Sequence, residues 1–186
     1  MISRLRPAPS HPLDAPRHAR RLAALRSLCL GLILLLVVIT VGIGMVIWYV
    51  LEGLPLAGRR FVVGGVSLPT VVTGVLTLAV PVVALWVGRL RGESGLHALA
   101  AEGEDDDAEK LLDVFAGRTF AEYAVAGGVG FAWALVFHLT SDPLMLLWIG
   151  GLMAFMALRY PTTRRARAWF DAAADRLARE RRARTL

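Results

Sequence analysis

The chain has 186 residues, of which 56% are hydrophobic and 19% are charged, and its net charge at pH 7 is +6. Soluble domains contain about 45–50% apolar residues, so this composition favours an integral membrane protein over an ordinary soluble domain. The single cysteine, Cys29, excludes an intrachain disulfide and a cysteine metal cluster. The basic residues gather beside apolar runs, where anionic lipid headgroups attract them, so nucleic acid is not an expected partner.

The N-terminal part divides into a tail and a first membrane span. Four prolines among polar and small residues predict that residues 1–16 form a disordered cytoplasmic tail. A membrane domain, 17–160, follows. Its first span, 27–51, has 25 residues without a charged side chain. As a helix of about 37 Å it exceeds the roughly 30 Å hydrocarbon core, and it is too long for a cleaved signal peptide.

A second span is predicted at 68–88, after a short external β-hairpin in which Phe61–Val63 and Val66–Leu68 flank two glycines. Pro81 predicts a kink in the middle of this span. Small and polar residues recur at three- and four-residue steps, and this face should pack inward: Thr70, Thr73, Gly74, Thr77, Pro81, Ala84 and Gly88. The face has two interpretations, close helix packing or a gate and polar path.

An acidic cytoplasmic loop is expected at 90–118. Its acidic residues lack the spacing and the central glycine of a calcium loop, so they predict a solvated linker. Asp107 then begins a short helix that Gly117 ends. Leu111, Leu112 and Phe115 face one way on this helix, which predicts that it lies on the bilayer surface.

The third span, 119–139, begins with Thr119 and Glu122 at the spacing of a capping box. The alternative interpretation places Glu122 in a proton or ion pathway, because an ionisable group at the edge of a span is costly and often functional. Arg118 lies four residues earlier and is expected to neutralise it. Two small-xxx-small pairs predict close contact with other helices: Ala124 with Gly128, and Ala126 with Gly130.

The fourth span, 143–160, follows a tight turn in which Asp142 is expected to cap the helix. His138 precedes Asp142 by four residues, so a contact between imidazole and carboxylate is expected at the interface. A role for His138 as a ligand or proton relay is the alternative, but no second histidine lies in a facing span. The close-packing face of the fourth span is predicted to be Gly150, Gly151, Ala154 and Ala157.

Three features of this half of the chain carry a family resemblance: Glu122 at the predicted start of the third helix, the Ser141-Asp142-Pro143 turn, and Tyr160-Pro161-Thr162 followed by arginines. They resemble small four-helix proteins of the bacterial inner membrane that have no characterised function. The resemblance covers about the last 70 residues. It implies a fold and a location but no activity.

The C-terminal segment, 161–186, is predicted to be a basic amphipathic helix in the cytoplasm. Anchoring on anionic lipid is the first interpretation, and docking to another protein is the second. Seven residues are expected at the lipid interface: Arg20, Arg21, Arg26, Arg164, Arg165, Trp169 and Phe170.

The predicted fold is therefore an all-α integral membrane protein, with four transmembrane helices arranged as two antiparallel hairpins. Nineteen lysines and arginines fall on one side of these spans and two, Arg59 and Arg60, on the other. This asymmetry predicts that both termini are cytoplasmic, in a bacterial inner membrane. We expect no catalytic residue, cofactor or metal. The expected function is a non-enzymatic scaffold or accessory subunit that binds lipid and another membrane protein or its own copies. The alternative is an oligomeric channel, a holin-like pore or a small transporter that uses Thr73, Thr77, Pro81 and Glu122.

Overall fold

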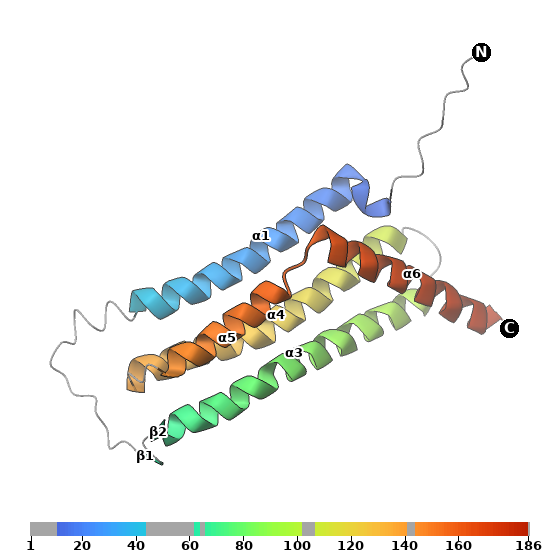
Figure 1. The fold of residues 1–186 in the computed structure, drawn as a ribbon. Coiled ribbons are helices and arrows are strands. Elements are labelled where there is room, and N and C mark those ends of the chain that lie inside the picture. Colours follow the sequence, from blue (N-terminus) through green and yellow to red (C-terminus); the bar gives the residue numbers. More distant parts are fainter. Residues whose placement is uncertain (1–10, 44–61, 64–65, 102–106, 141–143, 186) are drawn as a thin grey trace.

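The computed structural model describes residues 11–43, 62–63, 66–101, 107–140 and 144–185. The described residues are mainly helical (Figure 1). A short 3-10 turn, η1 (Pro12–Asp14), precedes helix α1 (Pro16–Val38), which continues as a π-helical stretch, η2 (Ile39–Ile43). The other helices are α3 (Leu68–Ala101), α4 (Asp107–Thr140), α5 (Leu144–Leu158) and α6 (Thr163–Thr185).

One pair of very short strands precedes α3. In this pair β1 (Val62–Val63) runs antiparallel to β2 (Val66–Ser67), so that Val62 lies opposite Ser67. An isolated two-stranded ribbon is at best marginally stable in water. The external β-hairpin therefore stays a prediction.

Three helical segments are long and apolar enough to cross a membrane: Pro16–Gly42, Val71–Ala101 and Asp107–Phe137. A fourth is obtained if α5 and α6 count as one broken span, although α6 is bent by 64° from α5. The first of these segments begins before the predicted span 27–51, and residues 44–51 of that prediction lie outside the described residues.

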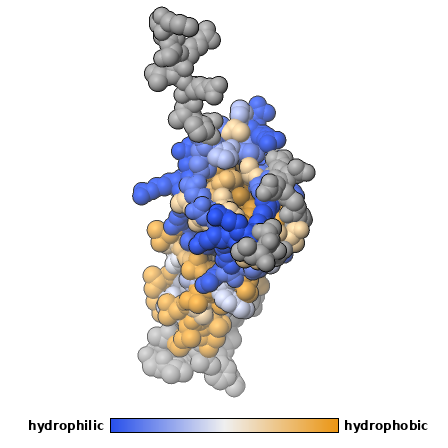
Figure 2. Space-filling model, turned by 90° about the vertical axis from the view of Figure 1, so that its right-hand side faces the viewer, coloured by the Kyte–Doolittle hydropathy of each residue, from blue (hydrophilic) through white to orange (hydrophobic). Residues whose placement is uncertain are grey.

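Helix α4 is central to the arrangement, because it contacts α1, α3, α5 and α6. The helices α1, α3, α4 and α5 run lengthwise beside one another, whereas α6 crosses the end of α3 and α4 (Figure 1). The first described residues and the end of α6 lie at this same end. Figure 2 shows that the surface there is hydrophilic, while the surface farther along the helices is hydrophobic.

We call the polar end the cap: it comprises η1, the first part of α1, residues 89–101 of α3, residues 107–118 of α4, and α6. The apolar remainder is the bundle. One hydrophobic cluster runs through the cap and the bundle; its part within the cap, here called the cap core, contains these large buried side chains: Leu13, Leu22, Leu96, Leu99, Leu111, Leu112, Phe115, Phe170 and Leu177.

The cap differs from the predicted loop and interfacial helices. Residues 90–101 continue α3, and α4 runs without interruption through Gly117, where the short surface helix was expected to end. The reason is that the apolar residues of this region face α6 rather than lipid, so their burial favours long helices over a loop. The predicted disordered tail also ends earlier, because Leu13 of η1 is buried in the cap core.

Most large side chains on the outer surface of the bundle are apolar. Leu78, Val82 and Leu147 are among its most exposed residues. Such a continuous apolar surface exceeds what monomeric soluble proteins present to water. It is the surface expected of helices that are solvated by lipid.

Candidate functional site

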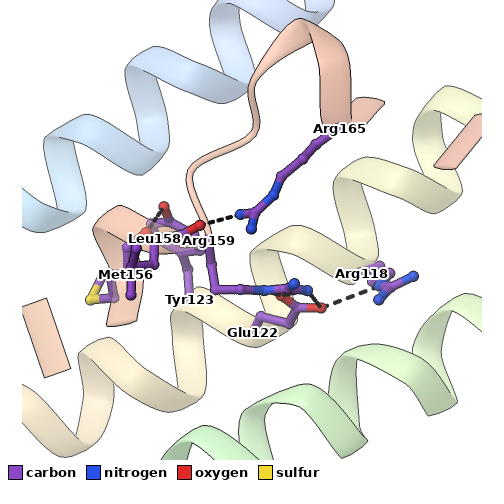
Figure 3. A network of polar contacts seen from close by, with 7 residues as sticks. All are labelled: Arg118, Glu122, Tyr123, Met156, Leu158, Arg159 and Arg165. Carbon is purple, nitrogen blue, oxygen red and sulfur yellow. Dashed lines mark hydrogen bonds and ion pairs between the residues drawn. The ribbon is translucent and has the colours of Figure 1, made fainter. Parts of the chain in front are cut away.

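A buried carboxylate, that of Glu122 in α4, lies where the cap meets the bundle. Arg159, which follows α5, donates from Nε to Oε2 at 2.9 Å and from Nη2 to Oε2 and Oε1 at 2.7 and 2.9 Å. Arg118, one turn earlier in α4, donates from Nε to Oε1 at 3.2 Å. The Glu122 side chain is 4% exposed, against 27% for Arg118 and 28% for Arg159. Two guanidinium groups that reach the surface thus enclose the carboxylate (Figure 3).

Two neighbouring residues fix the position of Glu122. Gly88 of α3 leaves the space for it, because a Cβ at that position would lie 2.7 Å from Glu122 Oε1. Tyr123, the next residue in α4, is buried and donates from its hydroxyl to the carbonyl oxygen of Met156 in α5 at 2.5 Å. The cluster therefore joins α3, α4 and α5 at one level of the molecule.

The structure corrects the capping role predicted for Glu122. Thr119 and Glu122 lie well inside α4, where backbone N–H groups are already bonded within the helix. The predicted contact between Arg118 and Glu122 is confirmed. Arg159 lies 37 residues from Glu122, and sequence reasoning missed it as a partner. The signal for it was an arginine at the end of an apolar segment, where a counter-charge is expected.

Two more arginines bind the turn that follows α5. Arg165 of α6 donates from Nη1 to the carbonyl oxygen of Leu158. Arg26 of α1 donates from Nε to Pro161 O at 2.9 Å and from Nη2 to Thr163 Oγ1 at 2.6 Å. Carbonyl groups at a helix C-terminus carry partial negative charge, so these cations stabilise it. The contacts fasten α1 and α6 to the end of α5.

The inward face predicted for the second span is confirmed: Thr73, Gly74 and Thr77 of α3 are buried. The Thr77 hydroxyl donates to Thr73 O at 2.8 Å and accepts from Trp133 Nε1 at 2.9 Å. The ring of Trp148 in α5 covers Gly74, where a Cβ would lie 2.5 Å from Cζ2. This part of α3 therefore serves close packing within the chain.

The remaining candidate residues of the spans are only partly described. Pro81 is half-buried and lies inside α3, which continues on both sides of it. The backbone of His138 belongs to α4, but its side chain lies outside the described residues. Asp142 lies outside them altogether. The predicted contact between His138 and Asp142 stays a prediction.

The five arginines predicted at the lipid interface divide into two groups. Arg20, Arg21, Arg164 and Arg165 are exposed, as contact with lipid requires. Arg26 is half-buried and is bound at the turn after α5. Arg21 also binds protein, because it donates to Asp113 Oδ1 at 3.1 Å.

The two aromatic residues predicted at the lipid interface lie in the cap instead. Phe170 is buried in the cap core. Trp169 packs against Phe115 with ring centroids 5.3 Å apart. An amphipathic helix must cover its apolar face, and here α3 and α4 cover that of α6.

Ion pairs close the cap at its outer end. Arg181 of α6 binds both carboxylate oxygens of Asp107 at 2.6 and 2.8 Å and donates to Leu99 O at 3.3 Å. A pocket of about 430 Å³ opens beside this pair, with Leu111 and Phe170 in its wall. Two guanidinium–carboxylate hydrogen bonds in parallel are stronger than neutral ones and fix orientation. They hold α6 against the start of α4.

The chemistry of these sites is that of charge neutralisation and helix packing. Within the described ranges, no three His, Cys, Asp or Glu side chains are grouped so that they could hold a metal ion. Comparison with protein families, curated proteins and solved structures finds no match to the chain. The resemblance to small four-helix inner-membrane proteins therefore stays a prediction.

Proposed function

We propose that the chain is an integral protein of a bacterial inner membrane and acts there as a non-enzymatic scaffold or accessory subunit. It spans the bilayer with the bundle and holds the cap in the cytoplasm. The apolar outer surface of the bundle supports insertion, and the excess of lysine and arginine on one side supports this orientation.

One observation carries the scaffold role: the small residues of α5 lie on its exposed side, opposite its buried large ones. Met145, Ile149, Leu152 and Met156 face the rest of the chain. The predicted close-packing face of Gly150, Gly151, Ala154 and Ala157 is exposed. These residues therefore do not pack the four helices together as predicted, and a Cβ at Gly150 or Gly151 would meet no described atom within 4 Å.

Helix α4 also exposes one of its two predicted small pairs. Of its two predicted small pairs, Ala126 and Gly130 are buried, and Gly130 lies against Leu36 of α1. Ala124 and Gly128 are exposed. In lipid there is no hydrophobic drive between helices, so small residues that let backbones approach are what favours association. Two helices of the bundle therefore present surfaces suited to further transmembrane helices.

A pore along α3 has less support. Thr73 and Thr77 face the chain's own bundle, and the Thr77 hydroxyl is engaged by Trp133. A water-accessible path would expose such side chains. Cysteine labelling in intact membranes tests this alternative: protection at positions 73 and 77 is expected, whereas labelling of both would favour the pore.

The scaffold role is tested by enlarging the exposed small face. A Cβ at Gly150 meets no atom within 4 Å and Ala154 is exposed, so Gly150→Ile combined with Ala154→Ile places both larger side chains on the outer surface. We expect the wild type to purify in mild detergent as a complex. The double variant should retain at most about one tenth of that complex, because a tenfold loss of affinity corresponds to about 1.4 kcal/mol.

The matched control is Leu78→Ile on α3, which keeps an exposed residue of the bundle large and lies outside the small faces of α4 and α5. It should leave the complex unchanged. A wild-type particle that is monomeric and without copurifying protein would contradict the proposal, and so would a double variant that retains the complex.

A further inference from the structure

We infer that the cluster of Arg118, Glu122 and Arg159 binds the phosphate of an anionic phospholipid. The site requires the membrane placement proposed above, but it requires no partner helix. It differs from the lipid contacts expected of exposed arginines, because here a buried carboxylate holds the cations in fixed positions.

The charge balance where α5 ends favours the binding of an anion. Four arginines bind around this end: Arg118 and Arg159 contact Glu122, whereas Arg26 and Arg165 contact backbone carbonyl oxygens of the last turn of α5 and the turn after it. Among the residues that the structure describes, the one carboxylate they contact is that of Glu122. The end of α5 and the turn after it therefore carry an excess of positive charge.

Arg118 and Arg159 retain N–H donors that Glu122 does not use. Arg159 uses Nε and Nη2 for Glu122, and Arg118 uses Nε. The other guanidinium nitrogens, Nη1 of Arg159 and both Nη of Arg118, bond to no described residue, and both side chains are more than a quarter exposed. Guanidinium groups bind phosphate through paired N–H donors. Glu122 thus orients two arginines while leaving donors for an anion.

The position of the cluster along the helices matches the level of the lipid headgroups. Gly88, which packs against Glu122, lies two residues after Trp86, whose side chain is 60% exposed. Exposed tryptophans are typical of the level of the lipid headgroups. Basic pockets between membrane helices on the cytoplasmic side are known to bind anionic headgroups. The cluster lies at the level where such a phosphate is present at high local concentration.

The test compares lipids and variants on the full chain in nanodiscs. The wild type is titrated with phosphatidylglycerol in a phosphatidylcholine background, and the shift of the thermal midpoint is followed. Phosphatidylglycerol should raise the midpoint, and Arg118→Gln should weaken the apparent affinity at least roughly fivefold, because it removes paired donors from the site together with one charge. The control Arg89→Gln removes an exposed arginine next to Gly88 whose charge Glu93 already balances, and it should change the affinity less than twofold.

Each other outcome is decisive. Equal effects of Arg118→Gln and Arg89→Gln would show general surface attraction and overturn the site. If inorganic phosphate stabilised the protein to the same extent, the ligand of the site would be a free phosphate anion and not the lipid. If Arg118→Gln does not fold, Arg118→Lys replaces it, and an affinity equal to that of the wild type would overturn a site that depends on paired donors. If the chain incorporated into nanodiscs but showed no preference for phosphatidylglycerol, the lipid site alone would be overturned. Extraction of the chain from membranes by carbonate would overturn the membrane placement.

Discussion

The cap and the bundle are built from the same helices but are held together by different forces. In the cap, large apolar side chains such as Leu99, Leu111 and Phe170 leave water, and ion pairs such as that of Arg181 with Asp107 surround them. In the bundle, the proposed membrane placement means that lipid solvates leucine as well as protein does, so contacts would depend on glycine, on hydrogen bonds such as that of Trp133 with Thr77, and on shape. On this proposal, one chain follows the rules of a soluble protein at one end and those of a membrane protein at the other.

The largest expected effect lies where the two regions meet. Arg159→Ala removes the bidentate partner of Glu122 and leaves a buried carboxylate with Arg118 alone, which should cost about 4 kcal/mol of unfolding free energy. Unfolding in mixed micelles measures it. Arg89→Ala removes an exposed arginine of the same region and should change stability by less than about 0.5 kcal/mol. Equal losses in the two variants would mean that the junction is no stronger than the surface.

A substitution in the cap core should have the next largest effect. Leu111→Ala is expected to destabilise the cap by about 3 kcal/mol, because it removes buried apolar surface and leaves a cavity. The exposed Leu90→Ala on α3 is the control. Amide hydrogen exchange would locate the change, which should appear in α6 and in the first turns of α4. Faster exchange confined to α5 would contradict a stabilising role of Leu111 within the cap.

The smallest expected effect is the loss of a polar contact in the bundle. Trp133→Phe removes the donor to Thr77 and should cost about 0.6 kcal/mol, the mean for hydrogen bonds between membrane helices. Trp86→Phe is the matched control, because Trp86 is exposed on α3. A loss larger than about 2 kcal/mol in the first variant would show that this polar contact holds the bundle more firmly than contacts in lipid usually do.

The sequence predicted the helices well and their partners poorly. Apolar length identified helices that are long enough to cross a membrane, and the three- and four-residue steps identified the buried face of α3. The amphipathic segments around Phe115 and Phe170 were expected on the bilayer, because an apolar helix face looks the same whether lipid or another helix covers it. The two segments cover each other, and periodicity carries no information about that pairing.

The candidate site shows the same limit. The contact between Arg118 and Glu122 follows from helical spacing, so it was predicted. The contact between Arg159 and Glu122 joins two helices and requires the space at Gly88, which a sequence pattern does not reveal. The small faces of α5 were recognised from composition, but whether they face inward or outward depends on which side the large residues Met145 and Ile149 occupy.

Helix α5 has a consequence for the bilayer itself. Its 15 residues give a length of roughly 23 Å, against about 30 Å for an average hydrocarbon core. Because Arg26 and Arg165 fasten the turn after it, the helix has little freedom to slide along its neighbours. If α5 crosses the bilayer as proposed, the lipid must therefore adjust, and the annulus around α5 should be thinner than the surrounding membrane. Such hydrophobic mismatch would draw the protein, and any partner on the same face, toward thin regions of the membrane.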